Sequence, residues 1–219
     1  MKAFFDALLD LFFPRRCPFC RCILKDYEKA HCKACSEKLP WARGSAQRQV
    51  MRHIERCVSP LFYEENVRSA LLRFKFHGLR VYAASFARIM ADALRQQEIS
   101  FDLITWVPVS AKRLKQRGYD QAQLLAEELS ELTLCPCRRL LLKTNDNPAQ
   151  SSLRSPEQRR KNVAGVYRLC DPESVKGRRI LLVDDIVTTG ATINECARML
   201  RSAGAEGVFG VTLARSRHS

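Results

Sequence analysis

The sequence predicts an α/β domain with an open parallel sheet, preceded by a small cysteine-rich unit. Three near-continuous apolar runs, at 101–110, 178–187 and 207–216, are typical of strands buried on both faces of a parallel sheet. Between these runs, 119–132 and 192–204 carry apolar residues at the 3.6-residue spacing of helices that cover a sheet. Because strand and helix alternate along the chain, we expect right-handed crossovers between parallel strands.

The charge of the chain indicates a polyanionic partner. With 37 Lys and Arg against 23 Asp and Glu, the 219 residues carry a formal net charge of +14. Such an excess favours nucleic acid or a phosphorylated small molecule as the ligand, and the total alone does not distinguish the two. The apolar content of 46% is that of a globular protein and argues against disorder.

The first thirteen residues form an amphipathic segment rather than a signal peptide. Asp6 and Asp10 interrupt the apolar run, no small-residue cleavage site follows it, and Pro14 ends it. The run is also far shorter than the ~20 apolar residues that cross a bilayer. We therefore expect a cytoplasmic protein whose first helix packs on its own chain, with a partner or a membrane surface as the alternative.

Two CxxC pairs near the start of the chain predict a structural zinc site. The segments CPFC and CKAC each present two thiolates from one tight turn, and two such turns complete a tetrahedral zinc shell. Ten cysteines without a secretion signal favour metal or thiol chemistry over a disulfide framework. The expected zinc ligands are Cys17, Cys20, Cys32 and Cys35. Two alternatives stay open: a redox CxxC pair, and replacement of one ligand by Cys22 or His31.

A polar run after Trp41 predicts the boundary between two domains. The segment ARGSAQRQ, at 42–49, has the composition of a linker. We assign residues 1–45 to an N-terminal helix and a four-cysteine zinc finger, and residues 46–219 to the larger α/β domain. The first of these two units is called the finger below.

The end of the run at 178–187 predicts a site for a ribose 5-phosphate. Asp184 and Asp185 lie at the carboxyl end of a central strand, where open α/β sheets bind ligands. The following turn, TTGAT, offers backbone amides and hydroxyls to a phosphate, while the two carboxylates accept hydrogen bonds from a sugar diol. The expected ligand-binding residues are Asp184, Asp185, Thr188, Thr189, Gly190, Ala191 and Thr192. The alternatives are a Walker B-like strand end, for which no GxxxxGK[ST] partner occurs, and an ordinary acidic turn.

These motifs together resemble one protein family. The segment ILLVDDIVTTGAT resembles the phosphoribosyl pyrophosphate (PRPP) binding motif of type I phosphoribosyltransferases. The segments CPFC…CKAC, LLRFKFHG, WVPVSAKRLKQRGYDQAQLLA and PAQSSLRSPEQRRKNVAGVYRL occur in the order found in the ComF family of competence-associated proteins. The chain departs from that family at Ser110, where Pro is usual, and at Asp120, where Asn is usual. The resemblance implies a type I phosphoribosyltransferase-like sheet flanked by helices behind a four-cysteine zinc finger.

The resemblance also implies two basic segments around the ligand. The segment SAKRLKQRG corresponds to the pyrophosphate loop, where Lys112 and Arg113 would neutralise a diphosphate; a solvated basic turn is the alternative. A lid is implied at 143–162, and within it SPEQ has the pattern of a helix start. The basic residues that follow this start are Arg159, Arg160 and Lys161. We expect them to contact phosphate or nucleic acid, and an ordinary exposed helix face is the alternative.

Two functions from different classes fit the sequence. The first, which the resemblance favours, is a cytoplasmic protein of DNA uptake in natural transformation that binds PRPP with Mg²⁺, and single-stranded DNA. Its partners would include other competence proteins, such as a helicase or a recombination mediator. The second is a PRPP-dependent transferase of unknown acceptor, with Phe74, Phe76 and His77 available to stack on a base unless they pack in the core. Phosphoribosyl transfer needs little covalent help from side chains, so the sequence does not establish whether chemistry occurs.

Overall fold

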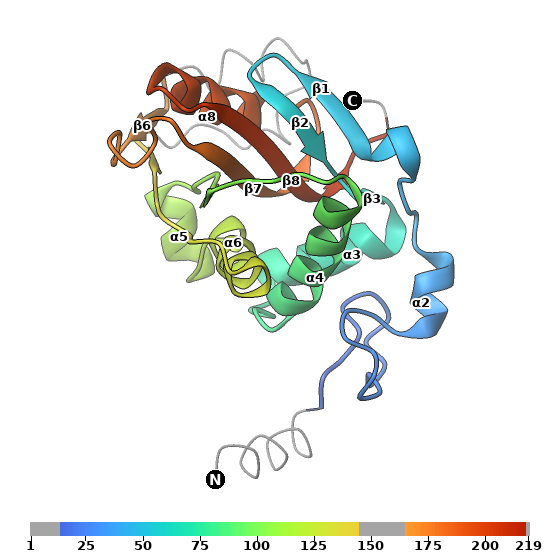
Figure 1. Ribbon diagram of the computed structural model, residues 1–219. Helices are drawn as coiled ribbons and strands as arrows, with labels where there is room; N and C mark the ends of the chain where they lie inside the picture. Colours follow the sequence, from blue (N-terminus) through green and yellow to red (C-terminus); the bar gives the residue numbers. More distant parts are fainter. Residues whose placement is uncertain (1–13, 145–164, 218–219) are drawn as a thin grey trace, which may run out of the picture.

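The computed structural model describes residues 14–144 and 165–217, which form a three-layered α/β domain with the finger against one layer (Figure 1). The strands of the main sheet are β1 (Arg48–Met51), β2 (Ile54–Val58), β3 (Leu61–Phe62), β4 (Leu103–Trp106), β7 (Arg179–Val187) and β8 (Gly207–Arg215). The helices are α2 (Lys33–Lys38), the 3₁₀ turn η1 (Gly44–Gln47), α3 (Glu65–Phe76), α4 (Tyr82–Gln96), α5 (Ala111–Arg117), α6 (Gln121–Thr133) and α8 (Ala191–Ser202). A separate antiparallel pair consists of β5 (Leu141–Lys143) and β6 (Tyr167–Leu169).

The main sheet is parallel through its centre and antiparallel at one edge. Its strand order is β1-β2-β8-β7-β4, with β3 pairing the end of β8. The three strands expected from apolar runs are confirmed as β4, β7 and β8, and they pair in parallel. The hairpin of β1 and β2 was not predicted, and it makes the sheet mixed rather than purely parallel. Its first strand alternates between exposed and half-buried residues, so it lacks the apolar run that marks a buried strand.

The two faces of the sheet carry separate apolar clusters, as the period of two along a strand requires. Leu181 and Val183 of β7 pack with α3, α4 and α6, whereas Ile180 and Leu182 pack with α8. The helices expected at 119–132 and 192–204 are confirmed as α6 and α8. This arrangement brings the carboxyl ends of β7 and β8 to one edge, where the turn into α8 begins.

The finger packs against the helical layer of the larger domain (Figure 1). Phe19, only 4% exposed, places its ring 5.9 Å from that of Phe86 on α4. The Arg73 Nη2 on α3 donates to the carbonyl oxygens of Pro18 and Phe19, at 2.7 and 3.1 Å. The finger and the helical layer thus share one apolar cluster. The domain boundary at residue 45 stays a prediction.

Two expected segments lie outside the described residues. These are the N-terminal amphipathic helix and most of the lid, including Arg159, Arg160 and Lys161. Within 14–144 and 165–217, the structure contains no helix with the length and apolar character that crossing a membrane requires.

The contact between Phe19 and Phe86 predicts a large stability loss on truncation of Phe19. Replacing a buried Phe by Ala removes its packing and leaves a cavity, which costs ~3–5 kcal/mol. We expect Phe19→Ala to lower the free energy of unfolding by about that amount, as measured by denaturant titration with zinc present. The matched control is Tyr27→Ala, since Tyr27 is an aromatic residue of the same finger that is 70% exposed. Equal losses in the two variants would show that the finger does not depend on this contact.

Candidate metal and ligand sites

The structure brings the four predicted zinc ligands together. The sulfur atoms of Cys17, Cys20, Cys32 and Cys35 all lie within 4.8 Å of one another. Tetrahedral zinc with Zn–S bonds of ~2.3 Å requires sulfurs ~3.8 Å apart, so the cluster needs little adjustment to bind the ion. The backbone supports the first pair, because the Arg21 amide donates to the Cys17 carbonyl at 2.8 Å and Arg21 takes a φ of +69°. The first CxxC pair therefore lies on a tight turn, as expected.

The two alternative zinc ligands lie beside the cluster. The Cys22 sulfur is 3.4 Å from that of Cys20, so it is a fifth thiol at the exposed edge of the site. His31 instead contacts aromatic rings: its own ring lies 5.6 Å from that of Trp41 and 6.5 Å from that of Phe19. The mutual proximity of the four sulfurs favours the predicted set over a shell that includes Cys22 or His31.

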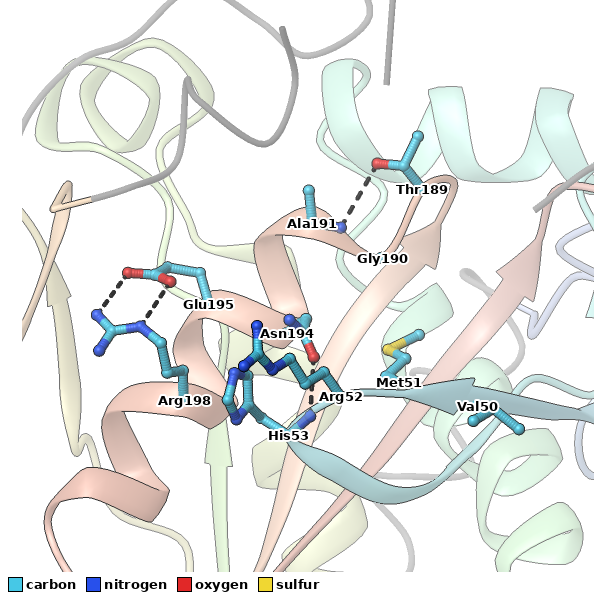
Figure 2. A pocket seen from close by; sticks show the side chains of 10 residues that line it. All are labelled: Val50, Met51, Arg52, His53, Thr189, Gly190, Ala191, Asn194, Glu195 and Arg198. Atoms are coloured by element: carbon cyan, nitrogen blue, oxygen red, sulfur yellow. Dashed lines mark hydrogen bonds and ion pairs between the residues drawn. The ribbon is translucent and has the colours of Figure 1, made fainter. Parts of the chain in front are cut away.

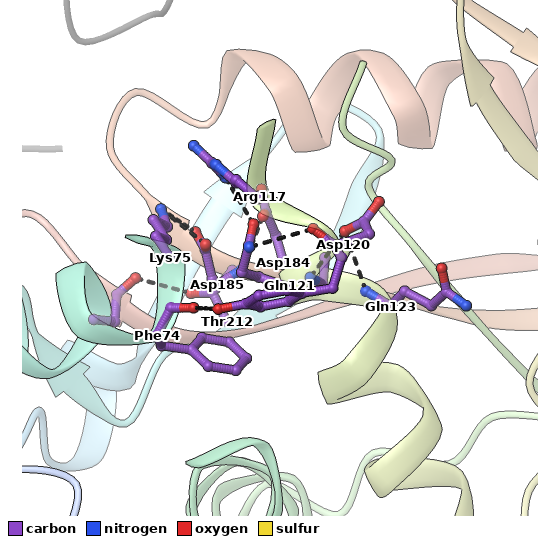
Figure 3. A network of polar contacts seen from close by, with 12 residues as sticks. Phe74, Lys75, Arg117, Asp120, Gln121, Gln123, Asp184, Asp185 and Thr212 are labelled. Carbon is purple, nitrogen blue, oxygen red and sulfur yellow. Dashed lines mark hydrogen bonds and ion pairs between the residues drawn. The ribbon is translucent and has the colours of Figure 1, made fainter. Parts of the chain in front are cut away.

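At the other end of the domain, Asp185 forms a buried ion pair that the motifs did not predict (Figure 3). Lys75, near the end of α3, places its Nζ 2.8 and 2.9 Å from the two carboxylate oxygens of Asp185. Asp185 is 6% exposed, so the lysine is its partner in a nearly water-free environment. The LLRFKFHG segment contains Lys75, but nothing local in that segment indicates a carboxylate 110 residues away.

Asp184 points to the opposite face of the sheet from Asp185. Leu182, two residues earlier, packs on the α8 side, and side chains alternate along a strand. Asp184 is half-buried, and its Oδ1 accepts a hydrogen bond from the Asp185 amide at 2.8 Å. Burial and the neighbouring charge of Asp185 raise the pKa of Asp184 well above its usual range. The two acids therefore differ: Asp185 is paired with lysine, and Asp184 is a carboxyl group with a raised pKa on the opposite face of the strand end.

The predicted phosphate turn connects β7 to α8. Gly190 precedes the first residue of α8 with a φ of +72°, a conformation that favours glycine, and the Thr189 hydroxyl accepts from the Ala191 amide at 3.5 Å. A Cβ at Gly190 would lie 3.1 Å from the Cε of Met51, so glycine also lets the β1–β2 hairpin pack here. Thr188 and Thr192, the other predicted hydroxyl residues, are half-buried in the same turn.

A pocket of about 550 Å³ lies between this turn, the first turns of α8 and the β1–β2 hairpin (Figure 2). The hairpin contributes Arg52 and His53, and the His53 amide donates to the Asn194 side chain at 3.0 Å. Glu195 and Arg198 of α8 face it as an ion pair at 2.8 Å. Sequence reasoning did not find this pocket, because the hairpin that forms one wall was not predicted.

The expected pyrophosphate loop folds as the short helix α5. Ser110, 2% exposed, caps it by accepting from the Arg113 amide at 3.4 Å. Lys112 is exposed and Arg113 is half-buried on this helix. The loop is closed by Asp120, whose carboxylate accepts from the backbone amides of the residues that begin α6 and from that of Val109, at 3.0–3.3 Å. A carboxylate suits this place because its three hydrogen-bond partners are backbone donors, and burial raises the pKa of Asp120.

An exposed aromatic residue lies beside the acidic strand end. Phe76 is 61% exposed, and the Arg117 guanidinium lies 4.9 Å from the centre of its ring. Arg117 also donates to the Gln121 side chain at 2.7 Å, and burial lowers the pKa of Arg117. Phe74, by contrast, is fully buried with its ring edge-on to that of Phe86, so it belongs to the core and cannot stack on a base. His77 is exposed.

Comparison with known proteins identifies both parts of the chain. Residues 114–219 match the phosphoribosyl transferase domain family, and residues 8–48 match the double zinc ribbon domain family. With the cluster of four sulfurs, the second match supports a structural zinc ion in the finger.

Three known proteins are similar to large parts of this chain. Competence protein F of Haemophilus influenzae is 29% identical over 226 residues, which cover 94% of this chain and 99% of that protein. Competence protein ComFC of Bacillus subtilis is 30% identical over 159 residues, 70% of this chain and 62% of that one. Among solved structures, glutamine PRPP amidotransferase from B. subtilis, complexed with ADP and GMP, has a TM-score of 0.44 and 20% identity; the match covers 64% of this chain and 30% of that one. A zinc ribbon ahead of a phosphoribosyltransferase domain, in a chain that matches competence proteins over nearly its whole length, shows that this protein belongs to the ComF family.

Proposed function

We propose that this protein binds PRPP with Mg²⁺, and single-stranded DNA, and that it acts in the cytoplasm during DNA uptake for natural transformation. One observation carries the proposal: an acidic strand end and the glycine turn into α8 lie beside a basic helix and an exposed aromatic ring. The names of the competence-protein relatives support the biological setting. The four-cysteine cluster fits the reducing cytoplasm, where thiols stay available to metal.

In this proposal the turn between β7 and α8 binds the 5-phosphate of PRPP. The first amides of α8 and the hydroxyls of Thr188, Thr189 and Thr192 are donors of the kind that bind phosphate at helix starts. Asp184 accepts hydrogen bonds from the ribose diol, and Lys112 and Arg113 of α5 neutralise the diphosphate. Asp185 already has a lysine partner, so it acts mainly by holding the strand end in place.

The donor set fits a magnesium ion that arrives with the ligand. Mg²⁺ prefers oxygen ligands and is usually held by one or two carboxylates together with substrate phosphates. The half-buried Asp184 is one such carboxylate, and PRPP supplies phosphate oxygens. The bound ion would neutralise negative charge on the diphosphate.

A surface for single-stranded DNA extends from the same site. α5 contributes exposed Lys112 and Lys115, and it contains no acid between Ala111 and Arg117. Phe76 offers an exposed ring, and single strands bind by backbone contact with cations together with stacking of bases on aromatic residues. The proposed surface also includes Arg159, Arg160 and Lys161, which lie outside the described residues.

A PRPP-dependent transferase is the second candidate, and one observation favours it. Phe76 and Arg117 form an exposed platform next to the strand end, where an acceptor base would stack. Release of pyrophosphate from PRPP in the presence of candidate bases or amines distinguishes this function from binding alone.

The zinc ligand set is tested by replacing one of its members. Structural zinc contributes ~10–16 kcal/mol of apparent binding free energy in finger peptides, so a lost ligand should release the ion. We expect Cys32→Ser to lose tightly bound zinc, measured by metal analysis after dialysis, while Cys22→Ser keeps one equivalent. A Cys32→Ser protein with a full equivalent of zinc would instead implicate Cys22 or His31.

The PRPP site is tested by calorimetric titration with Mg²⁺ present. We expect Asp184→Asn together with Asp185→Asn to abolish binding, because the sugar and metal contacts are lost. Asp184→Asn alone should also weaken binding while leaving the Lys75–Asp185 pair intact. The matched control is Asp26→Asn, an exposed acid in the finger. Wild-type affinity in the double variant, with its fold verified by circular dichroism, would refute the assignment of this turn.

The DNA surface is tested through the salt dependence of single-strand binding. Each phosphate contact contributes about −0.7 to the log–log salt slope, so replacing Arg159, Arg160 and Lys161 with Ala should flatten the slope by roughly 2. The control removes the same charge elsewhere, by replacing three finger lysines with Ala: Lys29, Lys33 and Lys38. A change in the control alone would place the DNA surface on the finger, and no binding at low salt would leave the transferase as the better candidate.

A further inference from the structure

The last turn of α3 contacts both the zinc finger and the ligand site. Arg73 reaches the finger, and Lys75, two residues later, reaches Asp185 at the end of β7. Between them, the carbonyl oxygen of Phe74 accepts a hydrogen bond from the Tyr119 hydroxyl, next to the loop that α5 and Asp120 form. Three consecutive residues of one helical turn thus link three parts of the molecule; Figure 3 shows two of them, Phe74 and Lys75.

The contact with the finger depends on the zinc-binding turn itself. Pro18 and Phe19, whose carbonyl oxygens accept from Arg73, lie between the predicted ligands Cys17 and Cys20. The Nε of Arg73 is buried and has no hydrogen-bond partner among the described residues. The half-buried guanidinium therefore depends on those two carbonyls, and a partly buried charge that loses its acceptors is destabilising. When zinc fixes this turn of the finger, it also fixes Arg73.

The contact with the ligand site controls the charge of the strand end. The Lys75 ammonium contacts both oxygens of Asp185, and the two side chains are 19% and 9% exposed. If the ammonium moved away, Asp185 would be an unpaired carboxylate beside Asp184, at a site that must receive a polyanion. The position of Lys75 therefore affects how well this site accepts a phosphorylated ligand.

We propose that the last turn of α3 couples zinc binding in the finger to PRPP binding at the strand end, with Arg73 and Lys75 as the positioning residues. The inference rests on the proposed function, since PRPP is the ligand. Zinc holds the turn in the conformation that pairs Lys75 with Asp185, and loss of zinc releases it. By linkage, bound PRPP raises the affinity for zinc by the same factor by which zinc raises the affinity for PRPP.

Zinc affinity with and without saturating Mg·PRPP is the decisive measurement. It is determined for the full chain by equilibrium competition with a chromogenic chelator. In the wild type, Mg·PRPP raises zinc affinity at least about fivefold, the lower end of typical coupling between sites. In Arg73→Met, which keeps the apolar stem and all four cysteines, zinc still binds. The ratio of zinc affinities with and without Mg·PRPP, however, falls to about one. The matched control is Arg68→Met, an exposed arginine on the same helix, and it keeps the wild-type ratio.

A second variant and a second observable separate this inference from the proposed function. Lys75→Met leaves the finger contact intact and should also bring the ratio to about one. If PRPP binds the wild type but zinc affinity does not change, the coupling is refuted and the proposed function stands. If PRPP does not bind, the proposed function fails, and hydrogen exchange then tests the coupling: zinc removal should increase exchange at residues 184–191 in the wild type but not in Arg73→Met. Unchanged exchange in the wild type would refute the coupling.

Discussion

The ion pair between Lys75 and Asp185 joins the helical layer to the functional edge of the sheet. Two adjacent carboxylates at a strand end are costly to ionise together when one of them is almost fully buried. Asp184 and Asp185 lie in different environments on the two faces of the strand. Asp185 is paired with the Lys75 ammonium, while burial raises the pKa of Asp184. Both acids lie just before the turn into α8.

The finger combines a candidate zinc site with packing against the larger domain. A unit of about 40 residues rarely buries enough apolar surface to be stable alone, and metal is the usual remedy. Here the ring of Phe19 packs on Phe86, which also contacts Phe74, so the finger shares an apolar cluster with α3 and α4. The finger therefore contacts α3, the helix that also carries Lys75.

The sequence predicted the elements that depend on residues close together in the chain. The apolar runs became β4, β7 and β8 because both of their faces are buried, and the spacing of the two CxxC pairs brought four sulfurs together. Other features depend on distant residues. Nothing near Lys75 indicates its partner, and α5 has no buried residue whose spacing would mark it as a helix. The opposite orientations of Asp184 and Asp185 follow from the period of a strand, but only the packing of α3 against one face decides which acid is paired.

The charges around the strand end explain why a polyanionic ligand would need a cation of its own. Asp120, Asp184 and Asp185 lie close enough to affect one another, Lys75 and Arg117 lie among them (Figure 3), and Arg113 is a further cation near Arg117. The site therefore contains charges of both signs. Lys75 forms an ion pair with Asp185, and the Arg117 guanidinium lies over the ring of Phe76. Neither cation is therefore fully free to bind a diphosphate. In the proposed function, the additional positive charge that PRPP would need would come from the basic face of α5 and from a magnesium ion that arrives with the ligand.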